Sequence, residues 1–536
     1  MNRAEMIERL RITPEWDICI IGGGATGLGI AVDAASRGLK TLLVEKSDFA
    51  KGTSSRSTKL VHGGVRYLQQ GNIKLVMEAL KERGILLNNA PHLVKNQAFI
   101  VPNYKWWEGA FYGIGLKVYD WMAGSLGFGP SQFLSKEETL ALAPTLDPEN
   151  LRGGVLYHDG QFDDARLAIH LAMTAADQGA VLINYMSVDG LMKANDKVCG
   201  VMVTDMLSNV STHPASAQTG SSSYEIKSKV VINATGVFTD SILKMDDVKS
   251  GPLVTMSQGI HIVLEREFLP TDTAILIPRT DDKRVLFAVP WHNKIIVGTT
   301  DTPVIKASSE PVAMDEEIDF IIHHIQKYLA KDPVRSDIKS VFAGLRPLIK
   351  SHSKNTAALS RDHHITVSQS ELITIAGGKW TTYRKMAEDV LEIAVHKAGF
   401  DEEKPTFAIC KTKNLRIHGY KKETDFKAPL YYYGNDELGI QSIIQEDKSS
   451  GELIHPSFPF IKAEITWAVK NEMCMTVEDF LSRRTRALLL DARSAMESAP
   501  VVAGIMAKEM QKDEIWVQDQ IVSFNFIAKN YLPGNY

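Results

Sequence analysis

One β-α-β unit near the N-terminus constrains the fold of this chain more than any other stretch. Residues 17–45 read in turn as a strand (18–21), a glycine turn, a helix (25–37) and a second strand (40–44). The turn has the spacing Gly22-x-Gly24-x-x-Gly27, and the second strand ends in Glu45. A strand, turn, helix, strand and acid in this order are typical of a dinucleotide-binding unit, whereas an isolated GxGxxG is a weak signal.

Each part of this unit has its own physical role. The first glycine permits a tight turn, the second lets a pyrophosphate approach the backbone, and the third lets the helix pack closely on the strand. The N–H groups at the helix start, at Ala25 and Thr26, point toward the phosphates. The carboxylate of Glu45 can bond ribose hydroxyls, and its charge argues against a 2′-phosphate. These residues do not decide between NAD and FAD.

The composition is that of an ordinary globular protein. The 536 residues suggest two to four domains, and the net charge of −4 gives no reason to expect nucleic acid. The four cysteines lie far apart in the sequence, so we expect reduced thiols and no metal site. The N-terminus reads as a charged amphipathic helix rather than a signal peptide, and the apolar runs are too short to predict a membrane-spanning helix.

A polar loop rich in small hydroxyl residues follows the first unit at residues 52–68. Its Gly63-Gly64 pair allows close approach of a ligand, and Arg56, His62, Arg66 and Tyr67 gather around it. A merely solvated loop is the alternative. The position directly after the nucleotide unit favours ligand contact.

Aromatic residues are concentrated at residues 104–128, where eight occur, against 8% in the whole chain. Helical spacing places several of them on one face: Trp107, Phe111, Ile114, Val118 and Trp121. From the pattern alone we favour a helix packed on the core. The alternative is an exposed face that lies in a membrane interface.

The remaining chain first alternates between strand and helix patterns and then becomes mostly strand-like. A helix (165–178) and hairpin strands (198–204 and 228–233) lead into Ala234-Thr235-Gly236. Residues 251–345 read as antiparallel strands with one helix (314–329), and a Gly377-Gly378 turn precedes a helix that ends near residue 396. After residue 400 the pattern is mostly helical to residue 511.

The chain resembles FAD-dependent glycerol-3-phosphate dehydrogenases of the quinone-linked type. The resemblance spans most of the chain and rests on IIGGGATGLGIAVDAASRG, SSRSTKLVHGGVRYL, APHLV, INATG, VGTTDT, GLRPL, LSRDH, GGKWTTYR and DFLSRRTRALLLD. It implies an α/β fold: a Rossmann-like FAD-binding domain with an inserted antiparallel β-sheet substrate domain and a C-terminal α-helical domain. We expect the FAD-binding domain at 1–100, 151–250 and 345–398, the substrate domain at 101–150 and 251–344, and the helical domain at 399–536.

The resemblance also assigns the FAD contacts. Beyond the glycine turn (Gly22, Gly24, Ala25, Thr26, Gly27) and Glu45, they fall on Ser54, Ser57, Thr58, Leu60, His62, Gly63, Gly64, Val188, Ala234, Gly236, Gly378 and Thr381. The helix opened at Thr381 would direct its positive end toward the reduced flavin.

The substrate contacts implied by the resemblance are mostly cationic: Arg66, Tyr67, Arg346, Arg361 and Lys379. Forked guanidinium donors suit a phosphate monoester that carries about two negative charges. His261, Arg346 and Lys379 are the expected catalytic residues, with His261 as the base and Arg346 on either the phosphate or the developing alkoxide. The alternatives are a surface ion pair for Arg361 and a structural strand histidine for His261.

The activity implied is oxidation of sn-glycerol 3-phosphate to dihydroxyacetone phosphate by hydride transfer to FAD, with electrons passed to a membrane quinone. We therefore expect a cytoplasmic enzyme, peripherally bound to the inner face of the cell membrane, and a possible homodimer. Rival interpretations are a glycerol-3-phosphate oxidase that uses oxygen, an amine or 2-hydroxy-acid oxidase, and a non-enzymatic flavin-bearing scaffold.

Overall fold

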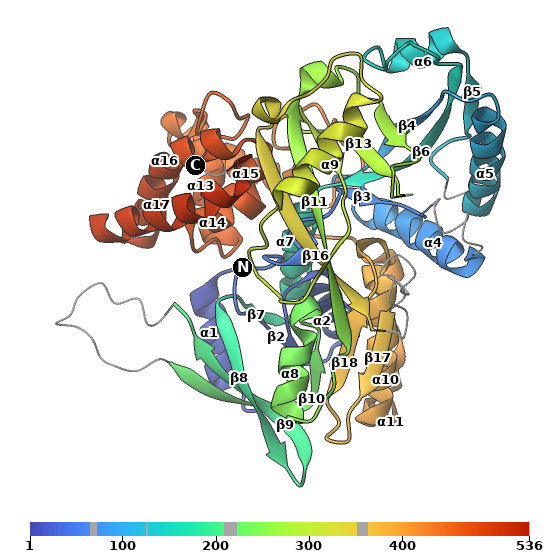
Figure 1. The fold of residues 1–536 in the computed structure, drawn as a ribbon. Coiled ribbons are helices and arrows are strands. Elements are labelled where there is room, and N and C mark those ends of the chain that lie inside the picture. The colour runs from blue at the N-terminus through green and yellow to red at the C-terminus, as the bar shows by residue number, and fades with distance from the viewer. Residues whose placement is uncertain (65–71, 125–126, 208–221, 283, 351–362, 535–536) are drawn as a thin grey trace.

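The computed structural model describes residues 1–64, 72–124, 127–207, 222–282, 284–350 and 363–534. Two β-sheets and a group of C-terminal helices make up the molecule (Figure 1). This arrangement confirms the predicted α/β class with an additional sheet layer and a C-terminal helical region. The division into three domains at particular residues stays a prediction.

The first sheet has the order β17-β18-β10-β1-β2-β7, and its neighbours from β18 to β7 are parallel. Its strands are β1 (Trp16–Ile21), β2 (Thr41–Val44), β7 (Val181–Ile183), β10 (Ser223–Asn233), β17 (His363–Val367) and β18 (Ile373–Gly377), with β8 (Met186–Ala194) and β9 (Lys197–Asp205) attached. β1 lies between two parallel neighbours, which explains its nearly uninterrupted apolar sequence. The predicted hairpin is present as antiparallel β9 and β10.

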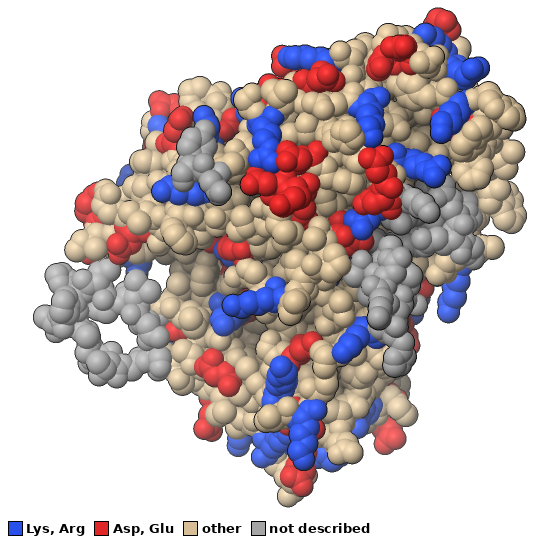
Figure 2. Space-filling view, viewed as in Figure 1, with Lys and Arg blue, Asp and Glu red and all other residues tan. Residues whose placement is uncertain are grey.

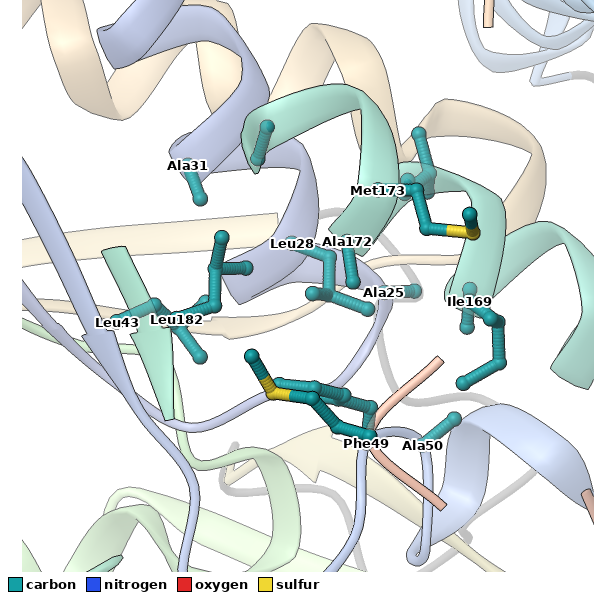
Figure 3. Close-up of a cluster of buried hydrophobic side chains, with 14 of the residues drawn as sticks. Ala25, Leu28, Ala31, Leu43, Phe49, Ala50, Ile169, Ala172, Met173 and Leu182 are labelled. Atoms are coloured by element: carbon teal, nitrogen blue, oxygen red, sulfur yellow. The ribbon is translucent and has the colours of Figure 1, made fainter. Parts of the chain in front are cut away.

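Helices pack on this sheet and form its core. α2 (Ala25–Arg37) contacts both α7 (Asp164–Asp177) and α10 (Tyr383–Lys397). Figure 3 shows the core between α2, α7, β2 and β7, where Leu28, Leu43 and Leu182 are fully buried. Burial of each leucine contributes about 2 kcal/mol. The other helices before residue 398 are α1 (Arg3–Ile12), α4 (Ile73–Asn89), α5 (Glu108–Ala123), α6 (Lys136–Leu142), α8 (Thr239–Asp246) and α9 (Asp315–Gln326).

The second sheet has the order β15-β11-β14-β13-β12-β4-β6-β3, with β16 on β11 and β5 on β6. Its strands are β3 (Leu60–Val61), β4 (Val94–Asn103), β5 (Gln132–Leu134), β6 (Gly153–Phe162), β11 (Val254–Glu265), β12 (Ala274–Ile277), β13 (Leu286–Trp291), β14 (Lys294–Gly298), β15 (Thr302–Val304) and β16 (Ser340–Ile349). The strand pairs are antiparallel, as predicted, except for the parallel pair β4 and β12. Ile321 and Ile325 of α9 belong to the core of this sheet.

The C-terminal helices extend beyond the predicted end at residue 511. They are α11 (Phe400–Glu403), α12 (Glu437–Glu446), α13 (Lys462–Asn471), α14 (Val477–Asp479), α15 (Ala487–Leu490), α16 (Ala492–Met510) and α17 (Glu514–Ala528). Buried ion pairs join them to the first sheet's loops and helices. Arg483 and Arg484 both contact Asp48, at 2.6 and 2.7 Å, and Arg166 contacts Glu472 at 2.6 Å.

For the aromatic face, the interpretation favoured from the helical pattern alone, that this face packs on the core, is wrong. α5 buries Gly113, Leu116 and Tyr119, whereas Trp106, just before it, and Trp121 are each 82% exposed. The predicted face of Trp107, Phe111, Ile114, Val118 and Trp121 points outward rather than into the core. The structure therefore agrees with the alternative, an exposed aromatic face. Within the part of the chain that the structure describes, no helix combines the length and apolar character needed to cross a membrane.

Candidate functional site

A cavity of ≈ 560 Å³ lies where the glycine turn, the loop after β2 and the second sheet meet. Most residues assigned to the cofactor line it, although they come from distant parts of the sequence. They are Gly22, Gly24, Ala25, Thr26, Glu45, Ser54, Ser57, Thr58, Leu60, His62, Val188, Ala234, Gly236, Gly378 and Thr381. The carboxyl ends of β1, β2, β10 and β18 meet here, at the edge where doubly wound sheets bind ligands.

The glycine turn leaves no room for a side chain at Gly22 and Gly27. Gly22 has φ +109°, and a Cβ there would lie 2.8 Å from the carbonyl oxygen of Ala234. At Gly27 a Cβ would lie 1.9 Å from the carbonyl oxygen of Gly22, so α2 packs directly on the turn. Gly27 does not line the cavity, in keeping with the packing role predicted for it. The turn forms a cradle of bare backbone that suits a pyrophosphate.

Glu45 lies at the end of β2 with its carboxylate held by two backbone donors. Gly23 N–H donates to Oε2 at 2.6 Å, and Ser47 N–H donates to Oε1 at 2.8 Å. Burial raises the pKa of Glu45, and these two hydrogen bonds oppose that rise. The carboxylate is thus oriented on the cavity wall, where it can accept hydrogen bonds from ribose hydroxyls.

The loop at residues 53–62 is held from several sides. Trp380 Nε1 donates to Ser54 O at 2.8 Å, and Ser54 Oγ accepts from Ala25 N at 2.9 Å. Asp164 accepts from the Ser57 N–H at 3.0 Å and from Lys59 Nζ at 2.7 Å. Both Lys59 and Asp164 are fully buried. The lining residues on this loop are therefore held in place by contacts within the protein.

His261 and Arg346 belong to neighbouring strands of the second sheet and point to the same face. β11 and β16 are antiparallel, with Ser257 opposite Arg346 and His261 opposite Phe342. Side chains alternate between the two faces of a strand, so Ser257 and His261, which are four residues apart on β11, lie on the same face. Their partners on β16, Arg346 and Phe342, lie on that face as well. Both His261 and Arg346 line the cavity.

His261 is a buried histidine with one established hydrogen bond. Its Nε2 lies 2.9 Å from Thr58 Oγ1, and its ring stacks on Phe342 at 4.9 Å between centroids. Among the described residues, Nδ1 has no hydrogen-bond partner. Burial, followed by the charges of Lys59 and Arg346, lowers the pKa of His261 well below its usual value. The imidazole is therefore neutral at pH 7.

Arg346 is a cationic residue that lines the cavity and has two side-chain neighbours. Its Nη2 donates to Thr299 Oγ1 at 2.9 Å, and its Nη1 lies 3.5 Å from Asp301 Oδ1. Lys379 also lines the cavity, as the N-cap of a 3₁₀ turn (Trp380–Thr382) that precedes α10. α10 thus begins at Tyr383, two residues after the predicted Thr381. The other predicted substrate contacts, Arg66, Tyr67 and Arg361, lie outside the described residues.

A second cavity of ≈ 560 Å³ adjoins the first. The two share Thr58, Leu60, His62 and Arg346. Gly64 lines the second cavity rather than the first, and the Gly63 N–H donates to Tyr119 Oη at 2.8 Å.

Sequence reasoning gave no role to several residues at these cavities. Arg284, Thr299 and Asp301 line the second one, and Arg284 Nη2 lies 3.8 Å from Asp301. Thr299 and Asp301 lie in the VGTTDT motif that contributed to the resemblance, so a signal was present without a role. Nothing around Arg284 in the sequence distinguishes it from a surface arginine.

Comparisons with known proteins agree with this geometry. The FAD dependent oxidoreductase family matches residues 17–384, and the C-terminal domain of alpha-glycerophosphate oxidase matches residues 368–515. The mitochondrial glycerol-3-phosphate dehydrogenase of Mesocricetus auratus is 39% identical over 97% of this chain and 74% of its own length. That of Schizosaccharomyces pombe is 38% identical over 99% of this chain and 89% of its own length.

A solved structure is similar over the whole chain. The glycerol-3-phosphate dehydrogenase from Bacillus halodurans, complexed with FAD, has a TM-score of 0.79 and 29% sequence identity. The alignment covers 99% of this chain and 97% of that one. FAD is accordingly the cofactor of this chain. The chain belongs to the family of FAD-dependent glycerol-3-phosphate dehydrogenases.

Proposed function

We propose that this protein oxidises sn-glycerol 3-phosphate to dihydroxyacetone phosphate and passes the electrons through FAD to a membrane quinone. The placement of Arg346 and His261 on one sheet face, in the wall of the FAD cavity, carries the proposal. A cation and a neutral base then face the cofactor from the same side. The relatives named above act on the same substrate according to their names.

In this proposal Arg346 binds the phosphate of the substrate. Its guanidinium lies at the junction of the two cavities, and Thr299 and Asp301 hold its position. A guanidinium can donate two hydrogen bonds to a phosphate and adds charge complementarity. Lys379, and the predicted contacts at Arg66, Tyr67 and Arg361, would complete the binding of this anion.

Bound FAD supplies the hydride acceptor, and the protein supplies geometry and a proton acceptor. His261 takes the proton of the C2 hydroxyl as the C2 hydride departs. Its Nε2 and the Thr58 hydroxyl both belong to cavity-lining residues, so the proton passes to the imidazole directly or through Thr58. A neutral imidazole is the form that accepts a proton. Lys59 is no competing base, because it does not line the cavity and bonds Asp164.

Anaerobic addition of glycerol 3-phosphate to the FAD-loaded protein tests the reaction. We expect the absorbance of the oxidised flavin to bleach within seconds and dihydroxyacetone phosphate to appear in equal amount. Glycerol and inorganic phosphate, added separately, should leave the flavin oxidised. Unchanged absorbance with glycerol 3-phosphate would refute the proposed substrate, and bleaching by amino acids or 2-hydroxy acids instead would support the rival interpretation.

The acceptor is proposed to be a quinone in a membrane that the exposed aromatic face of α5 contacts. Trp106 and Trp121 expose most of their surface, and tryptophan favours the interface between lipid and water. The edge of the molecule formed by α5 in Figure 1 is largely free of charged atoms in Figure 2. We expect peripheral binding at the inner face of the cell membrane. Formation of hydrogen peroxide at the full rate of turnover without quinone would favour an oxygen-dependent oxidase.

A further inference from the structure

Glu317 is a buried glutamate on the first turn of α9, and it lines neither cavity. Its Oε1 accepts hydrogen bonds from the hydroxyls of Thr300 and Thr302, at 2.9 and 2.7 Å. Its Oε2 accepts from Gln258 Nε2 at 2.8 Å and from the Met314 N–H at 3.1 Å. The bond to Met314 is an ordinary helix cap. The other three bonds tie α9 to β11 and to residues 299–302, here called the TTDT segment.

The TTDT segment lies between Glu317 and Arg346 and contacts them with alternate residues. Thr299 Oγ1 accepts from Arg346 Nη2 at 2.9 Å, and Asp301 Oδ1 lies 3.5 Å from Arg346 Nη1. Thr300 and Thr302, the intervening residues, bond the carboxylate of Glu317 instead. One set of side chains therefore holds the guanidinium, while the other set fixes the segment to α9.

The strand on which the guanidinium rests belongs to the same network. A Cβ added to Gly259 would lie 2.1 Å from Arg346 Nη2, so the guanidinium lies directly against bare backbone of β11. The residues on either side of this glycine are both held. Gln258 donates to the buried carboxylate, and the Ile260 N–H donates to Thr300 Oγ1 at 3.0 Å. The seat of the guanidinium and the segment that orients it are thus joined at one point.

A carboxylate suits this junction because it only accepts hydrogen bonds and has room for about four of them. Without it, buried N–H and O–H donors would lose their acceptor, and they would turn toward other acceptors or leave a costly unpaired group. Either change would shift the TTDT segment. A guanidinium that grips a phosphate with two parallel bonds depends on such placement, since a displacement of about 1 Å can cost about a hundredfold in rate.

We propose that Glu317 is a positioning residue for substrate binding, which sets the guanidinium of Arg346 in the orientation that grips the phosphate. This inference rests on the proposed function, in which Arg346 binds the phosphate of glycerol 3-phosphate. Glu317 itself does not touch the substrate, because it lines neither cavity. Its effect passes through Thr299 and Asp301.

A double-mutant cycle tests whether Glu317 acts through Arg346. We expect Glu317→Ala to lower kcat/KM for anaerobic flavin bleaching by glycerol 3-phosphate about tenfold in the parent protein. In the Arg346→Ala background the same substitution should change kcat/KM less than twofold, because the group that Glu317 positions is already absent. An equal loss in both backgrounds, or no loss in the parent, would overturn the inference.

Two further variants support the cycle. Glu316→Ala is the matched control, because Glu316 is the neighbouring glutamate on α9 and is exposed. It should match the parent. Glu317→Gln keeps the size of the side chain and one acceptor oxygen, so it serves if Glu317→Ala does not fold. It should lose about threefold in the parent and nothing in the Arg346→Ala background, and additive losses would again contradict the inference.

Binding of dihydroxyacetone phosphate to the oxidised, FAD-loaded protein gives a readout without turnover. The change in flavin absorbance measures Kd, and Glu317→Ala should raise Kd about tenfold while the ratio of flavin to protein stays at the parent value. An unchanged Kd would overturn the inference.

Failure of the proposed function would look different. A parent protein that glycerol 3-phosphate does not bleach, or an Arg346→Ala variant with less than a threefold loss, would refute that function and not the role of Glu317. A crystal structure of Glu317→Ala then decides the inference. A displaced guanidinium would support it, and an Arg346 that keeps its 2.9 Å contact with Thr299 would overturn it.

Discussion

Arg346 places its guanidinium at the junction of the two cavities, and its proposed role in binding the substrate depends on that group. Arg346→Ala should lower kcat/KM for glycerol 3-phosphate about a hundredfold, equivalent to roughly 3 kcal/mol of transition-state stabilisation. Arg346→Lys should recover part of this loss, because an ammonium keeps the charge but not the forked geometry. Arg335→Ala is the matched control, since Arg335 pairs with Asp315 and Asp319 on the surface. A loss below threefold for Arg346→Ala would remove this residue from the substrate site.

His261 gives a pH-dependent prediction whose sign follows from its environment. Burial, with the charges of Lys59 and Arg346, lowers its pKa well below 6.5, so the folded protein keeps the ring neutral from pH 6 to pH 9. The unfolded chain binds that proton near pH 6.5, so this residue's contribution to stability falls as the pH drops below 6.5 and is constant above it.

The turnover rate of the enzyme can be followed over the same pH range. The parent kcat should show no fall from protonation of His261 between pH 9 and pH 6. His261→Gln should lower kcat about a hundredfold at every pH in this range, because the proton acceptor is absent throughout. Stopped-flow bleaching at each pH would measure the chemical step. A variant that bleaches at the parent rate would leave His261 as a structural strand histidine.

A site residue could be predicted from sequence where the reason for its residue type lies within a few neighbouring residues. Gly22 and Gly27 were predictable because each must be glycine for reasons that lie within one turn. Arg284 and Asp164 were not, since they gain their roles from residues far away in the chain. Asp164, for example, directly follows Asp163, the N-cap of α7, and acidic residues are common at that end of a helix. Its burial beside Lys59 appears only in the folded structure.

At the scale of elements, the first β-α-β unit was predicted almost to the residue, whereas the orientation of α5 was not. The sequence of α2 is apolar along nearly its whole length, and a glycine at each end marks its limits, so its bounds do not depend on which face is buried. α5 carries apolar residues on both sides, with Gly113, Leu116 and Tyr119 buried and the tryptophan side exposed. Helical periodicity identifies stripes but does not decide which of two apolar stripes faces the core.

Membrane binding by α5 can be tested with residues that do not line either cavity. The double substitution Trp106→Ser/Trp121→Ser should reduce co-sedimentation with liposomes about tenfold, because two exposed indoles contribute most to interfacial binding. Flavin bleaching by glycerol 3-phosphate in solution should not change. Val522→Ser/Phe526→Ser is the control, since these exposed residues lie on α17. Equal sedimentation of the Trp106/Trp121 variant and the parent would contradict contact through α5.

At the scale of the molecule, the C-terminal helices help to hold the loop at residues 53–62, which lines the first cavity and is here called the cofactor loop. Arg486 Nη2 donates to Ser55 O at 2.6 Å and to Asp164 Oδ1 at 3.1 Å. Lys59 Nζ donates to the same carbonyl, at 2.8 Å, and to Asp164. Residues from α7, the cofactor loop and the C-terminal region thus meet at one buried carboxylate. FAD retention should therefore depend on a group that does not line the cavity.

Asp164→Asn tests this dependence while it keeps the size of the side chain. Lys59 and Arg486 would lose their shared countercharge in a buried site, which should cost about 3–5 kcal/mol and lower Tm by about 5 °C. The loop of Ser57 and Thr58 would loosen, so the ratio of flavin to protein after gel filtration should fall by about half or more. Asp315→Asn, on the exposed Asp315, is the control and should retain both values. A lower Tm with full flavin content would mean that Asp164 stabilises the fold without positioning the cofactor loop. If flavin is lost and then regained when FAD is added, the loop depends on this carboxylate.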